Sequence, residues 1–447
     1  MDLIIAFVIF AGSMVCCLIW DITMSAALLA GLACFFAAGL HRGFSAQALG
    51  QMVCGGAKKS FVVLRILLLI GLITALWRAG GTIGFFVYHS ISVITPHLFL
   101  LIAFLLTSLL SFALGTSFGI AGTAGVILMV LARSGGVDPV VCAGAVMSGA
   151  YFGDRCAPAS SSATLVAVVT DTSLYTNVKQ MLRTGALPML ITLGIYAVLS
   201  WRHPIADIDP AMLTALEREF DLGLLSVVPA VIMLVLPLLK VEVGRAMMGS
   251  IAASCLLTVT LEGKGLTAAL RYCIFGYQPQ EGLLADVLAG GGLVSMLDVT
   301  LIVLISCTYS GIFVGTGMLD GVQEKIASLA GRTGLFFTMI TTSLLTIGVF
   351  CNQTIATMLC SQLMGNVYEK RGATREELAI DMENSVITLA GVVPWSIACA
   401  VPLGMLGVGM EAIPYGVLLY MIPLCYLFTK RIWYRQNGGE GLRDEHE

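Results

Sequence analysis

The sequence predicts an all-α polytopic membrane protein of about 10–12 membrane segments, built as inverted repeats with re-entrant hairpins and discontinuous helices. The 447-residue chain is 58% hydrophobic and only 11% charged, and its mean hydropathy is +0.94. Apolar runs of about 17 to 25 residues, the length needed to cross a bilayer, recur throughout. Polar clusters interrupt several of these runs, which predicts helices that break within the membrane.

The individual segments follow from these runs in chain order. The clear runs cover residues 3–20, 22–40, 61–77, 98–114, 186–201, 222–239, 299–314, 335–350 and 415–428. Residues 83–95 and 251–292 are too irregular for a topology to be assigned from sequence. No basic segment precedes the first run, so we expect a retained membrane helix and not a signal peptide.

Charge predicts the orientation and the domain boundaries. The connection with Arg42, Lys58 and Lys59 is basic, which places it in the cytoplasm by the positive-inside rule. The acid-rich stretch 203–221 fits an external loop between two halves. We expect an N-terminal helical pair and cytoplasmic loop at 1–60, a first transporter repeat at 61–202, an external inter-repeat loop at 203–221, a second transporter repeat at 222–430 and a cytoplasmic tail at 431–447. Both termini are then cytoplasmic.

The stretch 149–164, GAYFGDRCAPASSSAT, carries the strongest polar signal. It lies between apolar runs, so its acid and base sit at membrane depth, where ionisable residues usually mark an ion or substrate path. Pro158 has no amide hydrogen to donate, and hydroxyls can satisfy the backbone groups that a broken helix releases. We predict a discontinuous helix with a binding site at the break.

Asp154 is the best candidate for the group that couples the binding of a proton to the binding of a cation. Protons and a cation such as Na+ can compete for the oxygens of a carboxylate in a low-dielectric site, which is an exchange mechanism in itself. Arg155 can hold Asp154 ionised or pair with an anionic substrate. The alternative is a structural Asp154–Arg155 pair that only fixes the break.

Hydroxyl groups next to Asp154 are candidate cation ligands, because hard cations favour oxygen. The alternative for each is to cap freed backbone groups. These residues are Ser160, Ser161, Ser162 and Thr164.

A second polar break, GTSFGIAGT at 115–123, contains Thr116 and Ser117. It fits the tip of a re-entrant hairpin or, from the spacing of Gly115 and Gly119, a close helix contact. The sequence favours neither of these two interpretations over the other.

The second half repeats the pattern. Ser-Leu-Leu-Ser at 108–111 and Pro158-x-Ser160 are echoed by Ser-Leu-Leu-Thr at 343–346 and Pro394-x-Ser396. Charges around the two broken segments make the repeat inverted, an arrangement known in secondary transporters. Candidate site residues here are Asn352, Gln353, Glu383, Asn384, Ser385, Trp395 and Ser396. Glu383 fits a second proton carrier or a helix-start acid, and Trp395 fits a cavity wall or a packing residue.

Other classes are less well supported. A serine nucleophile motif, an HExxH pair and a phosphate-binding loop are missing, which argues against an enzyme and against direct ATP drive. An intramembrane enzyme would need Asp154 and Glu383 as an acid/base pair. Polarity confined to breaks favours a carrier over a channel. The 13 cysteines lack metal-ligand spacing, and a net charge of −3 gives no sign of nucleic-acid binding.

At these motifs the chain resembles the NhaC-type Na+/H+ antiporters of the ion transporter superfamily, over roughly residues 60–428. The motifs are GTSFGIAGT at 115–123, SGAYFGDRCAP at 148–158, Glu383-Asn384-Ser385 and Val393-Pro394-Trp395-Ser396. The resemblance implies a bacterial inner-membrane secondary exchanger with Asp154 as its motif acid, without a cofactor beyond the transported Na+ and H+. The expected partners are membrane lipid and a small cation or organic acid, with a homodimer left open.

One departure from the family pattern bears on the substrate. Typical members have Lys in place of Arg155 and an acid where Ser161 stands, and losing that acid lowers the charge that can hold a cation or second proton. The sodium specificity and the stoichiometry are therefore open. Our first interpretation is a Na+/H+ antiporter. The alternative is a Na+- or H+-coupled exchanger of small organic acids or amino acids, with Arg155 and Trp395 contacting the substrate.

Overall fold

The computed structural model describes residues 2–20, 24–90, 96–204, 210–239, 241–316 and 333–435. Over these ranges the fold is all-helical, and the only strand-like feature is one isolated antiparallel bridge between Tyr277 and Gly290. The prediction of an all-α protein with many apolar helices is confirmed. Apolar helices of this number and length are typical of a multi-pass membrane protein.

Few of the described helices cross a membrane unbroken. Residues 117–134 and 174–202 are each long and apolar enough to do so, and a third candidate span is bent by 60° between residues 79 and 82. Other apolar helices are 10–17 residues long. Since a span needs about 20 residues, breaks inside the apolar runs explain the short helices.

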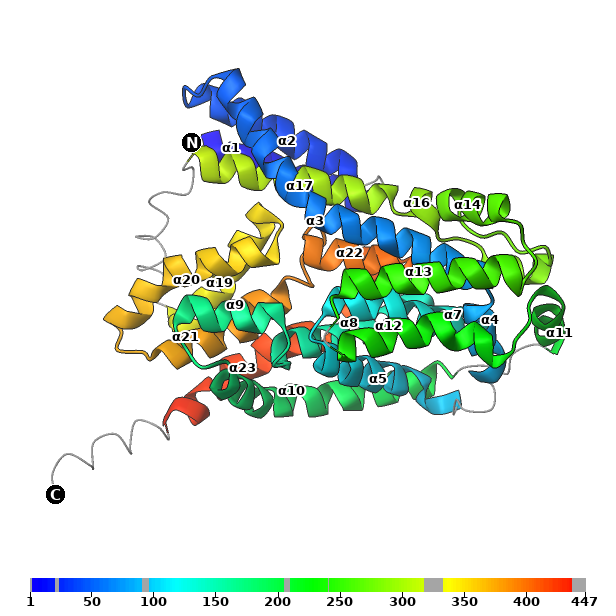
Figure 1. The fold of residues 1–447 in the computed structure, drawn as a ribbon. Helices are drawn as coiled ribbons and strands as arrows, with labels where there is room; N and C mark the ends of the chain where they lie inside the picture. Colours follow the sequence, from blue (N-terminus) through cyan, green and yellow to red (C-terminus); the bar gives the residue numbers. More distant parts are fainter. Residues whose placement is uncertain are drawn as a thin grey trace.

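Four helices line the upper side of the molecule in Figure 1, and glycines allow them to pack closely. A Cβ on Gly56 would lie 2.3 Å from the Cys307 carbonyl oxygen, and one on Gly311 would lie 2.0 Å from that of Met52. Small residues permit such close backbone contact in membrane helices. The helices are α1 (Asp2–Ile19), α2 (Met24–His41), α3 (Ala46–Ala79) and α17 (Leu297–Thr316).

The first unit contains two breaks. Helix α5 ends at Gly115, which adopts φ +68, and the Thr116 side chain caps the next helical segment. Helix α8 ends at Cys156, and Ser160 caps α9. The elements are η1 (Pro96–Leu98), α5 (Phe99–Leu114), α6 (Ser117–Ile120), a π-helical turn η2 (Ala121–Gly125), α7 (Val126–Ser134), α8 (Pro139–Cys156), α9 (Ser161–Thr170) and α10 (Leu174–Arg202).

The second unit breaks in the same manner. Helix α19 ends at Cys351, which adopts φ +55, and Asn352 caps α20. Further on, Ser396 caps α22. The elements are α19 (Leu335–Phe350), α20 (Gln353–Lys370), α21 (Arg375–Met382), a π-helical turn η5 (Glu383–Ile387), α22 (Ile397–Leu406), η6 (Met410–Tyr415) and α23 (Val417–Arg435).

The remaining elements lie before the first unit or between the two units, and they include the regions without a predicted topology. Residues 82–90 form a helix bent away from α3, while 91–95 lie outside the described residues. The stretch 251–292 contains most of α13, then α14 and two short helices. The elements are α4 (Thr82–Ser90), α11 (Pro210–Glu219), η3 (Leu224–Val227), α12 (Val228–Leu238), α13 (Val243–Thr260), α14 (Leu266–Phe275), η4 (Gly282–Leu284), α15 (Ala285–Leu288) and α16 (Gly292–Ser295).

Parts of several predicted segments lie outside the described residues. These are 21–23 of the N-terminal helical pair, 205–209 of the external loop, 240 and 317–332 of the second repeat, and 436–447 of the tail.

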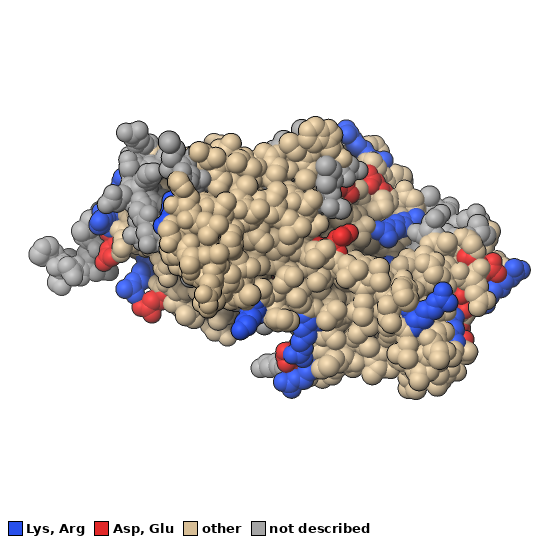
Figure 2. Space-filling view, turned by 90° about the horizontal axis from the view of Figure 1, so that it is seen from above, with Lys and Arg blue, Asp and Glu red and all other residues tan. Residues whose placement is uncertain are grey.

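The two broken units interlock. Helix α9 of the first unit packs against α20 and α21, and α22 of the second unit packs against η2 and α7. In Figure 1, α9, α20 and α21 lie toward one end, α7, α12 and α13 toward the other, and α22 between them. Figure 2 shows charged side chains at both ends of the face that it views, along its edges and at a few places near its middle. The breaks lie where the two units meet.

Candidate functional site

The first break is fixed by the hydroxyl of Ser160. Its Oγ donates to the Asp154 carbonyl oxygen at 2.5 Å and accepts from the amides of Ser162 and Ala163 at 3.1 and 3.3 Å. Proline at 158 interrupts the helix and the capping serine restarts it. The predicted discontinuous helix is present in the structure at this position.

The Asp154 side chain is buried, with 4% of its surface exposed. Ser162 Oγ lies 3.2 and 3.1 Å from its two carboxylate oxygens, and Ser160 Oγ lies 3.5 Å from Oδ1. Gln353 Nε2, from the other unit, donates to Oδ2 at 3.2 Å. Neutral hydrogen-bond donors from both units therefore surround the carboxylate.

The four predicted hydroxyls play different parts. Ser162 contacts the carboxylate, while Ser160 is occupied by the backbone groups of the break. Thr164 donates to the Ser160 carbonyl oxygen within its own helix. Ser161 is exposed. Within this set, Ser162 is the hydroxyl best placed to share a cation with Asp154.

Arg155 is fully buried and turned away from its neighbour Asp154. Its Nε and Nη2 donate to Asn384 Oδ1 at 3.1 and 2.5 Å, and Nη2 also donates to the Met181 carbonyl and to Thr184. Asp154 and Arg155 form no ion pair with each other within the described chain. The guanidinium instead joins α8 to α10 and to η5.

Glu383 lies in the interior of a helical segment. This segment begins at Arg375 with Thr374 as its cap, so the prediction of Glu383 as a helix-start acid is wrong. Its side chain is fully buried, and neither carboxyl oxygen has a hydrogen-bond partner among the described residues. A π-helical turn begins at this residue, a feature common at functional sites.

The neighbours of Glu383 connect to other helices. Asn384 accepts from Arg155, and Ser343 Oγ donates to Ser385 Oγ at 3.2 Å. Ser385 Oγ in turn donates to the Asp381 carbonyl at 2.6 Å. This part of the second unit is therefore tied both to the first break and to α19.

At the second break, Ser396 Oγ donates to the Ala390 carbonyl at 2.5 Å and accepts from the Cys399 amide at 3.2 Å. Trp395 Nε1 donates to the Gly348 carbonyl at 2.9 Å, and its ring contacts Phe10. The contacts of Trp395 are thus those of a packing residue that joins the break to α19 and α1.

The turns at 115–117 and 351–353, called tips below, touch the two breaks. A Cβ on Gly115 would lie 2.5 Å from the Ala159 carbonyl carbon and 2.6 Å from the Ser160 amide nitrogen. The Ile397 amide donates to the Cys351 carbonyl at 2.8 Å. Gly115 therefore makes a close backbone contact, as the packing alternative expects, and it also ends α5. The re-entrant hairpin stays a prediction.

Polar residues at the tips serve as caps. Thr116 accepts from the Gly119 amide and Asn352 accepts from the Ile355 amide, each at 3.2 Å. Ser117 is buried at the start of α6. Of the tip residues, only Gln353 donates to Asp154.

Equivalent features of the two units are separated by the same number of residues. Residues 115 and 351 adopt the left-handed conformation, 116 and 352 are caps, and 160 and 396 cap the broken helices, so each pair is 236 apart. Helices α5 and α19 both have 16 residues. The Pro-x-Ser match keeps this register. The Ser-Leu-Leu match, at 108 and 343, is one residue out of register.

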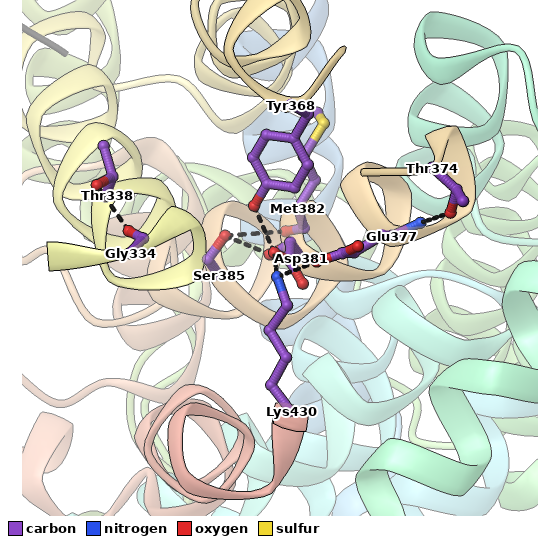
Figure 3. A network of polar contacts seen from close by, with 9 residues as sticks. All are labelled: Gly334, Thr338, Tyr368, Thr374, Glu377, Asp381, Met382, Ser385 and Lys430. Atoms are coloured by element: carbon purple, nitrogen blue, oxygen red, sulfur yellow. Dashed lines mark hydrogen bonds and ion pairs between the residues drawn. The ribbon is translucent and has the colours of Figure 1, made fainter. Parts of the chain in front are cut away.

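Sequence reasoning missed a charged network beside Glu383 (Figure 3). Lys430 of α23 forms ion pairs with Asp381 and, at 2.7 Å, with Glu377, and Tyr368 donates to Asp381. The sequence could have indicated Asp381, because it lies one helical turn before the predicted site residue Ser385 and therefore on the same helix face. Lys430 is 49 residues away from Asp381, so local spacing gives no hint of it.

Metal binding by clustered side chains is not seen. Among the residues that the structure describes, no group of three or more His, Cys, Asp or Glu side chains is arranged to hold a metal ion.

Comparison with known proteins places the chain among transporters. A malate-2H(+)/Na(+)-lactate antiporter of Bacillus subtilis is 28% identical over 418 residues, 89% of this chain and 88% of that protein. The Na(+)/H(+) antiporter NhaC of Alkalihalophilus pseudofirmus is 24% identical over 82% of this chain and 81% of its own length. The arginine/ornithine antiporter ArcD of Halobacterium salinarum is 27% identical over 60% of this chain and 57% of its own length.

These relatives are antiporters. The sequence model of the Na+/H+ antiporter family matches residues 1–165 and 149–429, which is almost the whole chain. The chain therefore belongs to the Na+/H+ antiporter family.

Proposed function

We propose that this protein is a Na+/H+ antiporter in which sodium and a proton compete for the Asp154 carboxylate. The observation that carries the proposal is the contrast between the two breaks. Ser396 donates to the Ala390 carbonyl in the same way that Ser160 donates to the Asp154 carbonyl. The fold therefore builds a break without an acid, and the acid at 154 is retained for another purpose.

The contacts of Asp154 suit a carboxylate that binds Na+ and H+ in turn. The carboxylate is held by neutral donors and not by a fixed cation, so its charge is open to compensation by Na+ or H+. Ser162 adds a hydroxyl oxygen, a ligand that hard cations accept. Glu383 is a second carrier candidate because its carboxyl oxygens make no hydrogen bond to the described residues.

The two units act as inverted repeats in this proposal. The shared separation of 236 residues supports a repeat, and the packing of α9 on α20 and of α22 on α7 supports opposite orientations. The matched elements cover 99–170 and 335–406, which is narrower than the repeats expected at 61–202 and 222–430. We place the protein in the inner membrane with both termini in the cytoplasm, following the basic connections.

Proton flux in proteoliposomes tests the proposal. With an imposed pH gradient, added sodium should collapse the gradient for the wild type and not for Asp154→Asn. Asp298→Asn is the matched control, because Asp298 is an exposed acid on α17. Loss of exchange in both variants, or sodium-driven exchange by Asp154→Asn, would contradict the role of Asp154.

A second candidate is a Na+- or H+-coupled exchanger of small organic acids or amino acids. It is favoured by the similarity to the malate/lactate and arginine/ornithine antiporters over most of the chain. Counterflow of labelled malate, lactate and arginine in the same proteoliposomes separates the candidates. Sodium-dependent uptake of one of them, with no response of the pH gradient to sodium alone, selects the exchanger.

A further inference from the structure

A cavity of about 220 Å³ lies at the opposite end of α22 from the Asp154 site. Its walls come from the ends of α3, α7 and α22 and from the segment 289–296. The volume is below the range of about 300–1,000 Å³ that drug-sized ligands occupy, and so suits a small molecule.

Arg78 lines this cavity although only 8% of its surface is exposed. Its Nη1 donates to the Thr74 carbonyl at 3.0 Å within the same helix. Its Nε is buried and has no hydrogen-bond partner among the described residues. A buried, incompletely bonded charge is costly, because its lost hydration is not replaced.

Arg133 lines the same cavity from α7. Its Nη2 donates to the Gly407 carbonyl at 3.0 Å and to that of Leu406 at 3.4 Å. Neither Arg78 nor Arg133 makes an ion pair with a described acid, and no acidic residue lines the cavity. Two positive charges thus face one small space without a carboxylate from the surrounding chain.

A structural role explains where both arginines lie, but it leaves one buried donor of Arg78 without a partner among the described residues. Cations near helix C-termini offset the helix dipole, and Arg133 bonds to the last carbonyls of α22 in that way. Arg78 likewise lies in the last turn of α3, where its Nη1 donates to the Thr74 carbonyl of the same helix. Its unbonded Nε is the group that an added acceptor would satisfy.

We propose that this cavity binds a small carboxylate through Arg78 and Arg133. A guanidinium presents paired N–H donors that match the two oxygens of a carboxylate. The remaining wall includes Val126, Met129 and Met405, which suits the carbon skeleton of an organic acid better than a bare inorganic anion.

This site is separate from the proposed cation site. Helix α22 runs from its cap at Ser396 to Leu406 beside the cavity, a rise of about 15 Å. Arg155 does not compete for the role, because its donors are already bonded to Asn384, Met181 and Thr184. The inference goes beyond cation exchange and stands whether or not Asp154 carries sodium.

Direct binding of malate to the purified full-length protein, measured by calorimetry, tests the proposal. We expect Arg78→Gln and Arg133→Gln each to raise the Kd for malate about tenfold, since hydrogen bonds to charged groups are lost. Arg271→Gln removes the same charge from an exposed position and should leave the Kd unchanged. Arg78→Lys keeps the positive charge but loses the paired N–H donors of the guanidinium, so its Kd should lie between those of the wild type and of Arg78→Gln.

Two further arms separate other outcomes. Asp154→Asn should bind malate with the wild-type Kd even where sodium-driven proton flux is lost, so the two proposals fail independently. Inorganic phosphate and vesicles containing phosphatidylglycerol serve as competitors. If wild-type protein active in exchange fails to bind malate, binds it equally well after Arg78→Gln and Arg133→Gln, or binds only phosphate or the lipid headgroup, the carboxylate site is refuted.

Discussion

The breaks at 154–160 and 390–396 share one backbone arrangement but carry different side chains. In both, a serine hydroxyl donates to a carbonyl six residues earlier and caps the helix that follows. The first break carries Asp154, Arg155 and Ser162 at positions where the second has Ala390, Gly391 and Ala398. Proline and serine therefore determine the backbone shape of a break, and the charged residues Asp154 and Arg155 are not needed for it.

The tips differ in a complementary way. Gly115 has to lack a side chain because of the 159–160 backbone, whereas Cys351 tolerates one in the same left-handed conformation. Gln353 of one tip donates to Asp154 in the opposite unit. Its counterpart in register is Ser117, for which no hydrogen bond to residues 390–396 is seen among the described residues. The two units share the same backbone arrangement, and side chains from both meet at Asp154.

The largest expected effect comes from placing an acid in the second break. Ala390 is fully buried, and the positions that hold Ser162 and Gln353 at the first break hold Ala398 and Ser117 here. Ala390→Asp should cost about 3 kcal/mol or more, because a buried carboxylate without donors is strongly destabilising. Thermal unfolding in detergent measures this, with Ala390→Asn as the isosteric neutral control. Equal stability of the two variants would mean that the second break can also hold a charge.

A methyl group at Gly115 should have the next largest effect. Gly115→Ala adds left-handed strain and a clash with the 159–160 backbone, which together cost about 2 kcal/mol or more. Cys351→Ala retains its Cβ and should cost less than about 1 kcal/mol. The same unfolding measurement compares them, and a tolerated Gly115→Ala would argue against the close contact between tip and break.

Removing the two capping serines tests their equivalence. Ser160→Ala and Ser396→Ala should each lower the free energy of unfolding by about 1–2 kcal/mol, since each loses a cap and a tie across the break. Thr164→Ala, which loses a hydroxyl bonded within its own helix, is the control. A large difference between the two serine variants would show that the breaks are not equivalent in energy.

The smallest effect in this series concerns affinity. Gln353→Leu removes a donor to Asp154 and should raise the half-activating sodium concentration about tenfold. Ser117→Ala, in the equivalent position of the other tip, should leave that concentration unchanged. Sodium titrations of proton flux give both values. An equal response of the two variants would place the cation contacts at both tips.

Much of the framework was predictable from local sequence. High hydropathy predicts the membrane class, and Pro158 with Ser160 predicts a break because proline cannot donate and serine can cap. The second break was predictable at Pro394-x-Ser396 for the same reason. The interpretation that was wrong concerned geometry, since an acid before an apolar run, as at Glu383, fits more than one local structure.

The sequence by itself determined the apolar segments, the places where helices break and the presence of a lone acid at one break. These depend on interactions within a few residues of the chain. Only the tertiary structure decided that Gln353 meets Asp154, that Arg155 turns to Asn384, that Lys430 pairs with Asp381 and that Arg78 and Arg133 share a cavity. Such contacts join residues far apart in the chain, and burial in a low-dielectric interior, which local spacing does not encode, gives them their strength.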